Sequence, residues 1–230
     1  MFIPFAKPLI NKEDIKHLNI AAKSQWISKG KYVDSFEKKL SNYLNTKYVG
    51  VTSSGSSAIM LAFLVLGLKP GDEIILPGYG FLAAANVAKT LGLKVVFSDV
   101  DADSYCVNLE NIKKVVTRKT KLVIIIHLYG NMCEVDRIVS FCKSNKIFLL
   151  EDSAQSIGSK YYNKPAGSLG TIGCFSAHPL KNLNAIGDAG YLTTNNKKIY
   201  EKVVELRNHG MTNRNKIKTF GYVSRMDNVQ

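Results

Sequence analysis

A lysine and two acidic residues are the groups in this chain best suited to covalent imine chemistry. Lys181 follows a Ser-x-His-Pro turn that begins at Ser176, and it precedes a glycine-broken loop that ends at Gly190. Upstream, an apolar strand runs directly into Glu151 and Asp152. A lysine amine attacks an aldehyde to form an imine, and a carboxylate stabilises a protonated ring nitrogen. Together these groups predict a site for pyridoxal 5′-phosphate (PLP), which requires both.

Each of these residues also has a plainer interpretation when it is taken alone. Asp152 is equally compatible with a helix N-cap, because aspartate is a preferred capping residue. Lys181 is one of many lysines in a chain with 31 Lys and Arg residues. The PLP interpretation therefore depends on the other parts of a site occurring in a workable order along the chain.

A turn rich in serine, residues 53–57, offers a place for a phosphate group. It includes Gly55 and Ser56, follows a short strand and opens a helix. Backbone N–H groups and the helix dipole at such a position favour an anion. The competing interpretation is a plain helix cap, because serine commonly occupies the N-cap. The turn matches neither a Walker A motif nor a dinucleotide-binding glycine fingerprint.

Two more strand ends carry residues with two interpretations each. Phe81 follows the Pro77-Gly78 strand break, and it is either a ring that stacks on a planar cofactor or a core residue. His127 follows the apolar run 121–126, and it is either a polar site residue or a buried, hydrogen-bonded histidine. Ligands of open α/β sheets bind at the carboxyl ends of strands, which makes both residues site candidates.

Strands and helices alternate along the middle of the chain. This repetition, with continuous apolar strands, predicts an α/β fold with a three-layer architecture: a mostly parallel central sheet with helices on both faces. Residues 1–47 are expected to form helices and an N-terminal arm, and residues 226–230 to begin another helix. Strands are expected at 48–52, 72–76, 94–97, 121–126, 147–150 and 190–194, and helices at 57–66, 81–91, 109–116, 135–144 and 198–207.

The composition limits the classes of partner that the protein is expected to bind. The chain has 230 residues, of which 46% are hydrophobic and 21% charged, as in soluble globular proteins. Its net charge of +13 comes from scattered lysines, so no nucleic-acid partner is expected. Four cysteines without a CxxC pair indicate a reduced, cytoplasmic protein with no metal site. Neither a signal peptide nor a membrane-spanning run is expected.

Taken jointly, the motifs resemble the nucleotide-sugar aminotransferases of the DegT/StrS family, which are fold-type I PLP enzymes. The resemblance covers essentially the whole chain, and the combination of Asp152–Gln155 with Ser176–Lys181 is its most specific part. The other matching segments are residues 26–30, 36–37, 54–56, 77–81, 127–130, 221–222 and 224–227.

The resemblance implies a role for each matching residue. Lys181 forms a Schiff base with PLP and shuttles the proton, and Asp152 pairs with the pyridine nitrogen. The remaining implied cofactor contacts are Gln155 near the phenolic oxygen, Phe81 on the ring, and Gly55, Ser56 and Ser176 at the phosphate. Such enzymes transfer an amino group, usually from glutamate, to a keto group of a nucleotide-linked sugar. They work as homodimers that share their active sites.

Three departures from the family pattern accompany this resemblance. Val223 stands where relatives often carry an asparagine that reaches the partner subunit's phosphate, and Asp188 replaces a commoner glutamate. Residues 1–230 are expected to be the PLP-binding large domain with its N-terminal arm, without the small C-terminal domain of the family. Two alternatives remain open. They are a PLP-dependent sugar dehydratase, which Lys181 disfavours because dehydratase relatives carry histidine there, and a truncated, non-catalytic regulatory or interaction protein.

Overall fold

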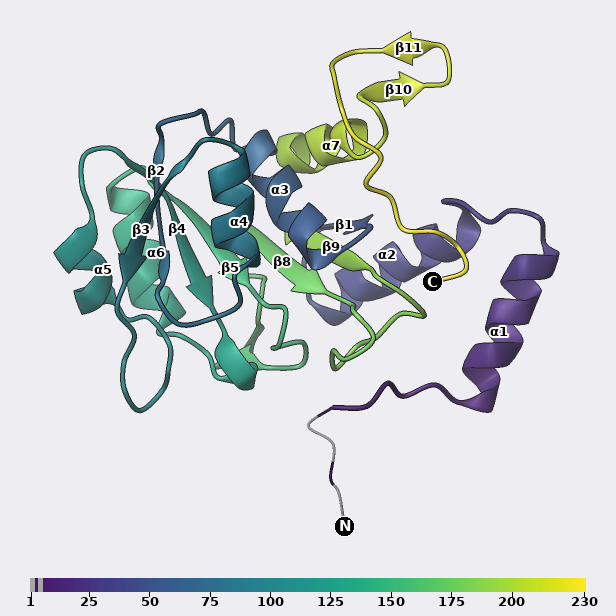
Figure 1. The fold of residues 1–230 in the computed structure, drawn as a ribbon, viewed down its shortest axis with the longest axis horizontal. Helices are drawn as coiled ribbons and strands as arrows, with labels where there is room; N and C mark the ends of the chain where they lie inside the picture. Colours follow the sequence, from purple (N-terminus) through teal and green to yellow (C-terminus); the bar gives the residue numbers. More distant parts are fainter. Residues whose placement is uncertain (1–2, 4–5) are drawn as a thin grey trace.

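A seven-stranded sheet forms the centre of the structure, a computed structural model that describes residue 3 and residues 6–230 (Figure 1). Residues 1–2 and 4–5 of the expected N-terminal arm lie outside the described residues. The strand order is β1-β9-β8-β5-β4-β2-β3. The strands are β1 (Tyr48–Thr52), β2 (Glu73–Pro77), β3 (Lys94–Ser98), β4 (Thr120–Ile126), β5 (Phe148–Asp152), β8 (Ile172–Ser176) and β9 (Gly190–Thr194).

The direction of the strands brings several carboxyl ends to one edge of the sheet. β2 pairs in parallel with β3 and β4, and β5 pairs in parallel with β4 and β8. β9 runs antiparallel to both β8 and β1, so β1 points the same way as the parallel strands. The mostly parallel sheet predicted from the sequence is therefore confirmed.

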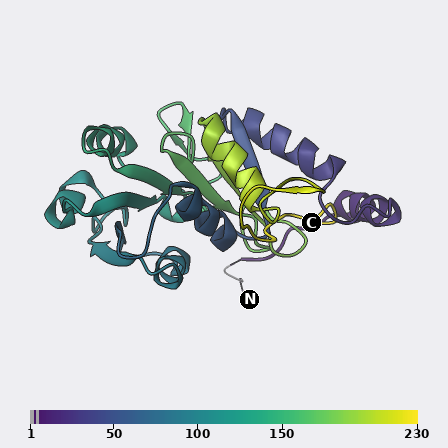
Figure 2. The same cartoon turned by 90° about the horizontal axis from the view of Figure 1, so that it is seen from above.

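Helices cover both faces of this sheet, as predicted (Figure 2). One face packs against α3 (Gly55–Val65), α4 (Ala83–Thr90) and α7 (Lys197–Leu206). The other packs against α2 (Lys31–Tyr43), α5 (Leu109–Val115) and α6 (Val135–Ser144). Among the helices described, none is both long enough and apolar enough to traverse a lipid bilayer.

Helix α1 (Lys12–Lys23) lies apart from the sheet (Figure 1). A reciprocal capping box starts it, in which the Asn11 side chain accepts from the Asp14 N–H and the Asp14 carboxylate accepts from the Asn11 N–H. Ala21 is its one buried residue, whereas Ile15 and Ile20 are each 45% exposed. Local capping therefore defines this helix, and its apolar side chains remain largely uncovered.

The prediction that a helix begins at residue 226 is wrong. Asn228 instead joins the two ends of the chain: its N–H donates to the Ile27 carbonyl oxygen, and its amide donates to that of Trp26. The Asn228 side-chain oxygen accepts from the Val33 N–H. Asn228 thus bonds to a segment that is distant in the sequence rather than to the preceding turn of a helix. These bonds hold residues 226–230 as a turn against the N-terminal segment.

The sequence patterns also missed β8 and two short hairpins. β8 contains Gly173, where an added Cβ would lie 2.3 Å from the Gly167 carbonyl oxygen. The glycine that weakens the strand pattern is thus required by the close approach of another backbone. The hairpins are β6 (Lys160–Tyr161) with β7 (Lys164–Pro165), and β10 (Met211–Asn213) with β11 (Lys216–Ile217).

A buried ion pair fastens the β1 edge of the sheet to both helix layers. Arg207 follows α7 and is 2% exposed, and its guanidinium donates to Glu37 of α2. The same guanidinium donates to the Val51 carbonyl oxygen at 2.7 Å, while Glu37 accepts from the Val51 N–H at 3.0 Å. One residue from each helix layer therefore completes the hydrogen bonds of β1.

Removing Arg207 should destabilise the whole chain. We expect Arg207→Met to lower the free energy of unfolding by about 3 kcal/mol, because it leaves Glu37 charged and poorly solvated. Lys197→Met is the matched control on α7, since the Lys197–Glu201 pair is exposed and should contribute less than about 1 kcal/mol. Urea denaturation measures both. Equal effects of the two substitutions would contradict the role assigned to Arg207.

Candidate active site

Lys181 lies in the loop that joins β8 to β9. The base of this loop is closed by two backbone bonds, from the Ala177 N–H to the Ala189 carbonyl oxygen and from the Ala185 N–H to that of Ala177. A tighter turn within it is closed by the Lys181 N–H, which donates to the His178 carbonyl oxygen at 2.8 Å. Lys181 is partly buried, and its ammonium forms no ion pair within the described residues. Its amine is therefore held near the sheet edge and remains available to a ligand.

Asp152 is a buried carboxylate with few hydrogen-bond partners to stabilise its charge. It ends β5 and is 6% exposed. Its Oδ1 accepts from the Ala154 N–H at 3.1 Å, and no hydrogen bond to Oδ2 occurs within residues 6–230. Burial raises the pKa of Asp152, opposed by the Ala154 N–H and by the positive charge of Lys181. Such a group favours a cationic or hydrogen-donating ligand.

The serine-rich turn is a helix cap that also leaves backbone N–H groups free among the described residues. Ser54 is the N-cap of α3, and its side chain accepts from the Ser57 N–H, so the capping interpretation is confirmed. In the described part of the chain, the N–H groups of Gly55 and Ser56 have no acceptor. Free N–H groups at the start of an 11-residue helix suit a phosphate.

Two glycines allow the backbone to close around this turn. A Cβ on Gly190 would lie 2.4 Å from the Ser54 carbonyl carbon. A Cβ on Gly55 would lie 2.9 Å from the Ser176 Cβ. The start of β9, the end of β8 and the first turn of α3 therefore meet only because both residues lack side chains. This contact places Ser176 beside the free N–H groups of α3.

The amide of Gln155 has a defined orientation. Its Oε1 accepts from the Tyr129 N–H at 2.9 Å, in the 3₁₀ turn η1 (Leu128–Gly130). Tyr129 has a φ of 55°, an uncommon conformation for a residue with a Cβ. Because the oxygen is occupied, the NH₂ group of Gln155 is the part left to donate to a ligand.

The seven cofactor contacts expected from the sequence all line one cavity of about 670 Å³. Phe81 lies two residues before α4 and is 66% exposed, so it is not a core residue. Its ring is free to cover a flat ligand. The seven residues are Gly55, Ser56, Phe81, Asp152, Gln155, Ser176 and Lys181.

The cavity is also lined by residues that were not among the expected cofactor contacts, including Ile126, Cys174, His178 and Asp188. Cys174 lies two residues before Ser176 on β8, so the period of a strand could have placed it on the same face. His178 belongs to the turn already recognised before Lys181. Nothing distinguishes Ile126 from the core residues that precede it in β4.

His127 lies behind the cavity rather than in it. It is 0% exposed, and its Nε2 lies 2.9 Å from Oε2 of the equally buried Glu151. The Cys133 N–H donates to Nδ1, which leaves the proton on Nε2. The interpretation of His127 as a buried, hydrogen-bonded histidine is therefore the correct one.

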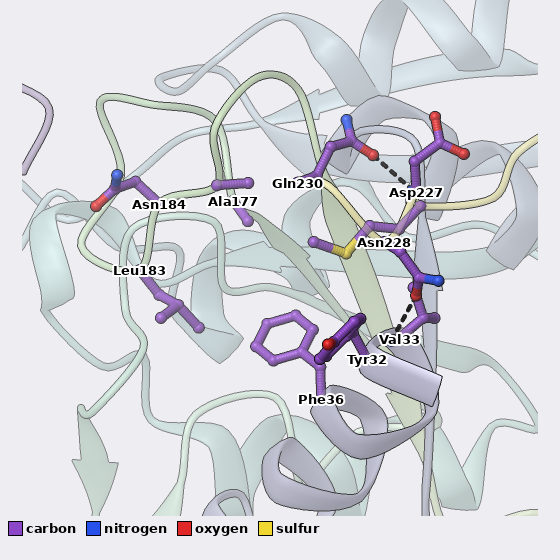
Figure 3. Close-up of a pocket in the computed structure, with 11 residues that line it drawn as sticks. Tyr32, Val33, Phe36, Ala177, Leu183, Asn184, Asp227, Asn228 and Gln230 are labelled. Carbon is purple, nitrogen blue, oxygen red and sulfur yellow. Dashed lines mark hydrogen bonds between the residues drawn. The ribbon is translucent and has the colours of Figure 1, made fainter. Parts of the chain in front are cut away.

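A second, smaller cavity of about 210 Å³ lies beside the Lys181 loop (Figure 3). Tyr32 and Phe36 of α2 face Leu183 and Asn184 of the loop across it. The C-terminal turn closes another side through Asn228 and its neighbours. None of the cofactor contacts expected from the sequence lines this cavity, so it is separate from the Lys181 site.

Comparison with known proteins matches residues 8–230 to the model of the DegT/DnrJ/EryC1/StrS aminotransferase family. GDP-perosamine synthase of Escherichia coli O157:H7 is 33% identical over 99% of this chain and 63% of its own length. The 3-oxo-glucose-6-phosphate:glutamate aminotransferase of Bacillus subtilis is 33% identical over 100% of this chain and 52% of its own length.

A solved structure supports the same family assignment as these relatives. The PLP form of a sugar aminotransferase from Streptococcus pneumoniae superposes with a TM-score of 0.92 at 28% identity. The match covers 100% of this chain and 64% of that one. This chain thus spans between about half and two thirds of the length of these proteins. On its sequence and its fold, the chain belongs to the DegT/DnrJ/EryC1/StrS aminotransferase family.

Proposed function

We propose that residues 1–230 are the cofactor-binding large domain of a PLP-dependent sugar aminotransferase. The reaction moves an amino group from an amino acid such as glutamate to the keto group of a nucleotide-linked sugar. One observation carries the proposal: a buried carboxylate, a lysine amine and an anion-binding helix start line a single cavity. The names of the two relatives support a GDP-linked sugar and a glutamate donor, respectively.

The polar groups of the cavity fit the phosphate of PLP. The free N–H groups of Gly55 and Ser56 and the hydroxyl groups of Ser56 and Ser176 are donors of the kind a phosphate dianion requires. The positive end of the α3 dipole adds to their attraction. We therefore assign phosphate binding to this corner of the cavity.

The remaining lining groups fit the ring of PLP. When bound, PLP supplies an electron sink for the amino carbon. Asp152 would hold the positive charge on the pyridine nitrogen, because its largely buried carboxylate lines the cavity and has an oxygen without a hydrogen-bond donor among the described residues. The NH₂ group of Gln155 would donate to the phenolic oxygen, and Phe81 would cover one face of the ring.

Lys181 has two proposed tasks that both use its amine. It would hold the aldehyde carbon of the bound cofactor, and as a free amine it would carry the proton at the reacting carbon. Its place in a closed loop limits the positions of Nζ, which is what proton transfer over a short distance requires. A lysine at this position supports transamination over dehydration.

We further propose that the enzyme is a cytoplasmic homodimer. Leu9 (77% exposed) and Ile10 (45% exposed), just before α1, extend the uncovered apolar side chains of that helix, which a second copy would bury. All four cysteines are unpaired, as expected in a reducing compartment. Val223 is 60% exposed, so its apolar side chain is available to a partner even though it lacks the asparagine's hydrogen bonds.

The function is tested in two half-reactions. Protein loaded with PLP is mixed with glutamate, and we expect about one equivalent of 2-oxoglutarate per cofactor, because a single half-reaction consumes the aldehyde. GDP- and UDP-linked keto sugars are then added, and mass spectrometry detects the amino sugar. Bound cofactor that releases no 2-oxoglutarate with any amino acid donor would contradict the proposal.

Substitution of Lys181 should abolish covalent attachment of the cofactor. After reduction with borohydride, the unaltered chain should carry PLP on the peptide that contains Lys181. Lys181→Ala should carry none, because no other lysine lines the cavity. Lys198→Ala, at an exposed position of α7, is the control and should be labelled fully. Labelling of another lysine in the Lys181→Ala protein would show that the assignment is wrong.

Asp152→Asn should have opposite effects on stability and on cofactor binding. Because burial raises its pKa, Asp152 destabilises the cofactor-free chain increasingly as the pH rises above its unfolded-state pKa of about 4, and fully above its folded-state pKa. The substitution should therefore increase urea resistance at pH 7, and this gain should vanish below about pH 4, where the carboxyl group is protonated in both states. PLP affinity should fall roughly tenfold or more, because a charge-assisted hydrogen bond is lost.

The control for this substitution is Asp103→Asn, at an exposed position in the loop after β3. It should change neither the urea midpoint nor PLP affinity by a measurable amount. If Asp152→Asn left PLP affinity unchanged, Asp152 would not be the partner of the pyridine nitrogen.

A further inference from the structure

Cys106 and Cys133 form a pair of thiols outside the cavity. Cys106 lies in the loop after β3, and Cys133 lies between η1 and α6. Their sulfur atoms lie 3.7 Å and 3.3 Å from the same atom, the carbonyl oxygen of Ile126. Two sulfurs that point at one oxygen are neighbours, although 27 positions of sequence separate them.

The surroundings favour a reactive thiolate at Cys106. The neighbouring Cys133 thiol lowers the pKa of Cys106 to about 7, helped by the Leu128 N–H and by His127 and opposed by burial. The pKa of Cys133 is raised by the same contact and by burial. Burial alone raises the pKa of Cys142 to about 12. Cys106 is thus the attacking sulfur, and Cys133 is placed to react second.

We propose that Cys106 and Cys133 are an oxidation site at which hydrogen peroxide forms an intrachain disulfide. The Cys106 thiolate attacks one peroxide oxygen, becomes a sulfenic acid and releases hydroxide, which takes up the thiol proton as water. The Cys133 sulfur then attacks the Cys106 sulfur, and the sulfenic oxygen leaves as a second water. In total, two thiols are oxidised by two electrons, and one peroxide is reduced to two waters.

Access for a small oxidant comes from the loop that carries Cys106. Cys106 itself is 3% exposed, but the preceding Tyr105 is 50% exposed. Tyr105 has a φ of 56°, and its N–H closes a short turn on the Asp101 carbonyl oxygen. Among the described residues this loop pairs with no strand, so its opening breaks its own turn bonds and the bond from the Asn131 amide to the Ser104 carbonyl oxygen but leaves the sheet intact. Peroxide is small enough to use such an opening.

The disulfide would act on the cavity through the η1 turn. The Cys106 thiol donates to the Asn131 carbonyl oxygen at 3.4 Å, the Asn131 N–H closes η1 on the Leu128 carbonyl oxygen, and the N–H of Tyr129 in this turn holds Gln155. A Cys106–Cys133 bond removes the contact with Asn131, because a disulfide sulfur carries no proton to donate. The η1 turn and the amide orientation of Gln155 are therefore coupled to the redox state of the pair.

Peptide mapping tests the oxidation site without reference to function. Trypsin places the four cysteines on separate peptides: residues 95–113, 122–137, 138–143 and 161–181. After peroxide treatment and alkylation, we expect the first two to be joined and the last two to be alkylated. Cys133→Ser should instead accumulate a sulfenic acid on Cys106, which dimedone labels. Cys142→Ser is the control and should form the same cross-link as the unaltered chain.

Any other mapping result overturns the proposal. A cross-link between other cysteines would show that geometry does not select this pair. Full alkylation of Cys106 and Cys133 after peroxide treatment would show that the pair is inert. Because no cofactor or substrate is involved, neither outcome bears on the proposed aminotransferase activity.

A second measurement tests the coupling to the cavity, and it rests on the proposed function. Oxidised protein should bind PLP several-fold more weakly than reduced protein, and dithiothreitol should restore the affinity. The Cys133→Ser protein should show no reversible change. Equal affinities before and after verified cross-linking would overturn the coupling, whereas absence of PLP binding in both states would instead contradict the proposed function.

Discussion

Two adjacent carboxylates at the end of β5 govern the layout of this domain. Successive strand residues face opposite sides of a sheet, so Glu151 and Asp152 are buried in different surroundings. Glu151 accepts three backbone N–H groups from residues 167–170 and lies against His127. Within the described part of the chain, the Asp152 carboxylate accepts only the Ala154 N–H. The first carboxylate is satisfied and organises the loops behind the sheet, and the second retains a free oxygen in the cavity.

Close contacts between backbone segments position the rest of the site around the Asp152 carboxylate. The antiparallel β9 returns the chain to the serine turn, where Gly190 and Gly55 let three segments meet without side chains between them. The Lys181 loop arises from the same reversal of chain direction, because it connects the neighbouring antiparallel strands β8 and β9. Lys181 and Asp152 therefore line the same cavity because one strand of the sheet reverses direction.

The order of most strands and helices was predictable because it depends on local patterns, and the seven cavity residues were expected from motifs together with the resemblance to the family. Strand–helix alternation predicts the sheet, and motif spacing singles out Asp152 and Lys181. The orientation of Gln155 was not predictable, because it depends on a left-handed residue in another loop. The burial of His127 depends on Glu151, 24 positions away. Contacts between distant segments decide these features, and a single sequence carries no record of them.

The most direct test of the account is the protonation state of the pyridine nitrogen in the bound cofactor. PLP labelled isotopically at that nitrogen can be loaded into the chain and observed by NMR near neutral pH. The account predicts the chemical shift of a protonated nitrogen, because the buried Asp152 carboxylate requires a cation beside it. The Asp152→Asn protein should show the shift of an unprotonated nitrogen. An unprotonated nitrogen in the unaltered chain would contradict the central claim.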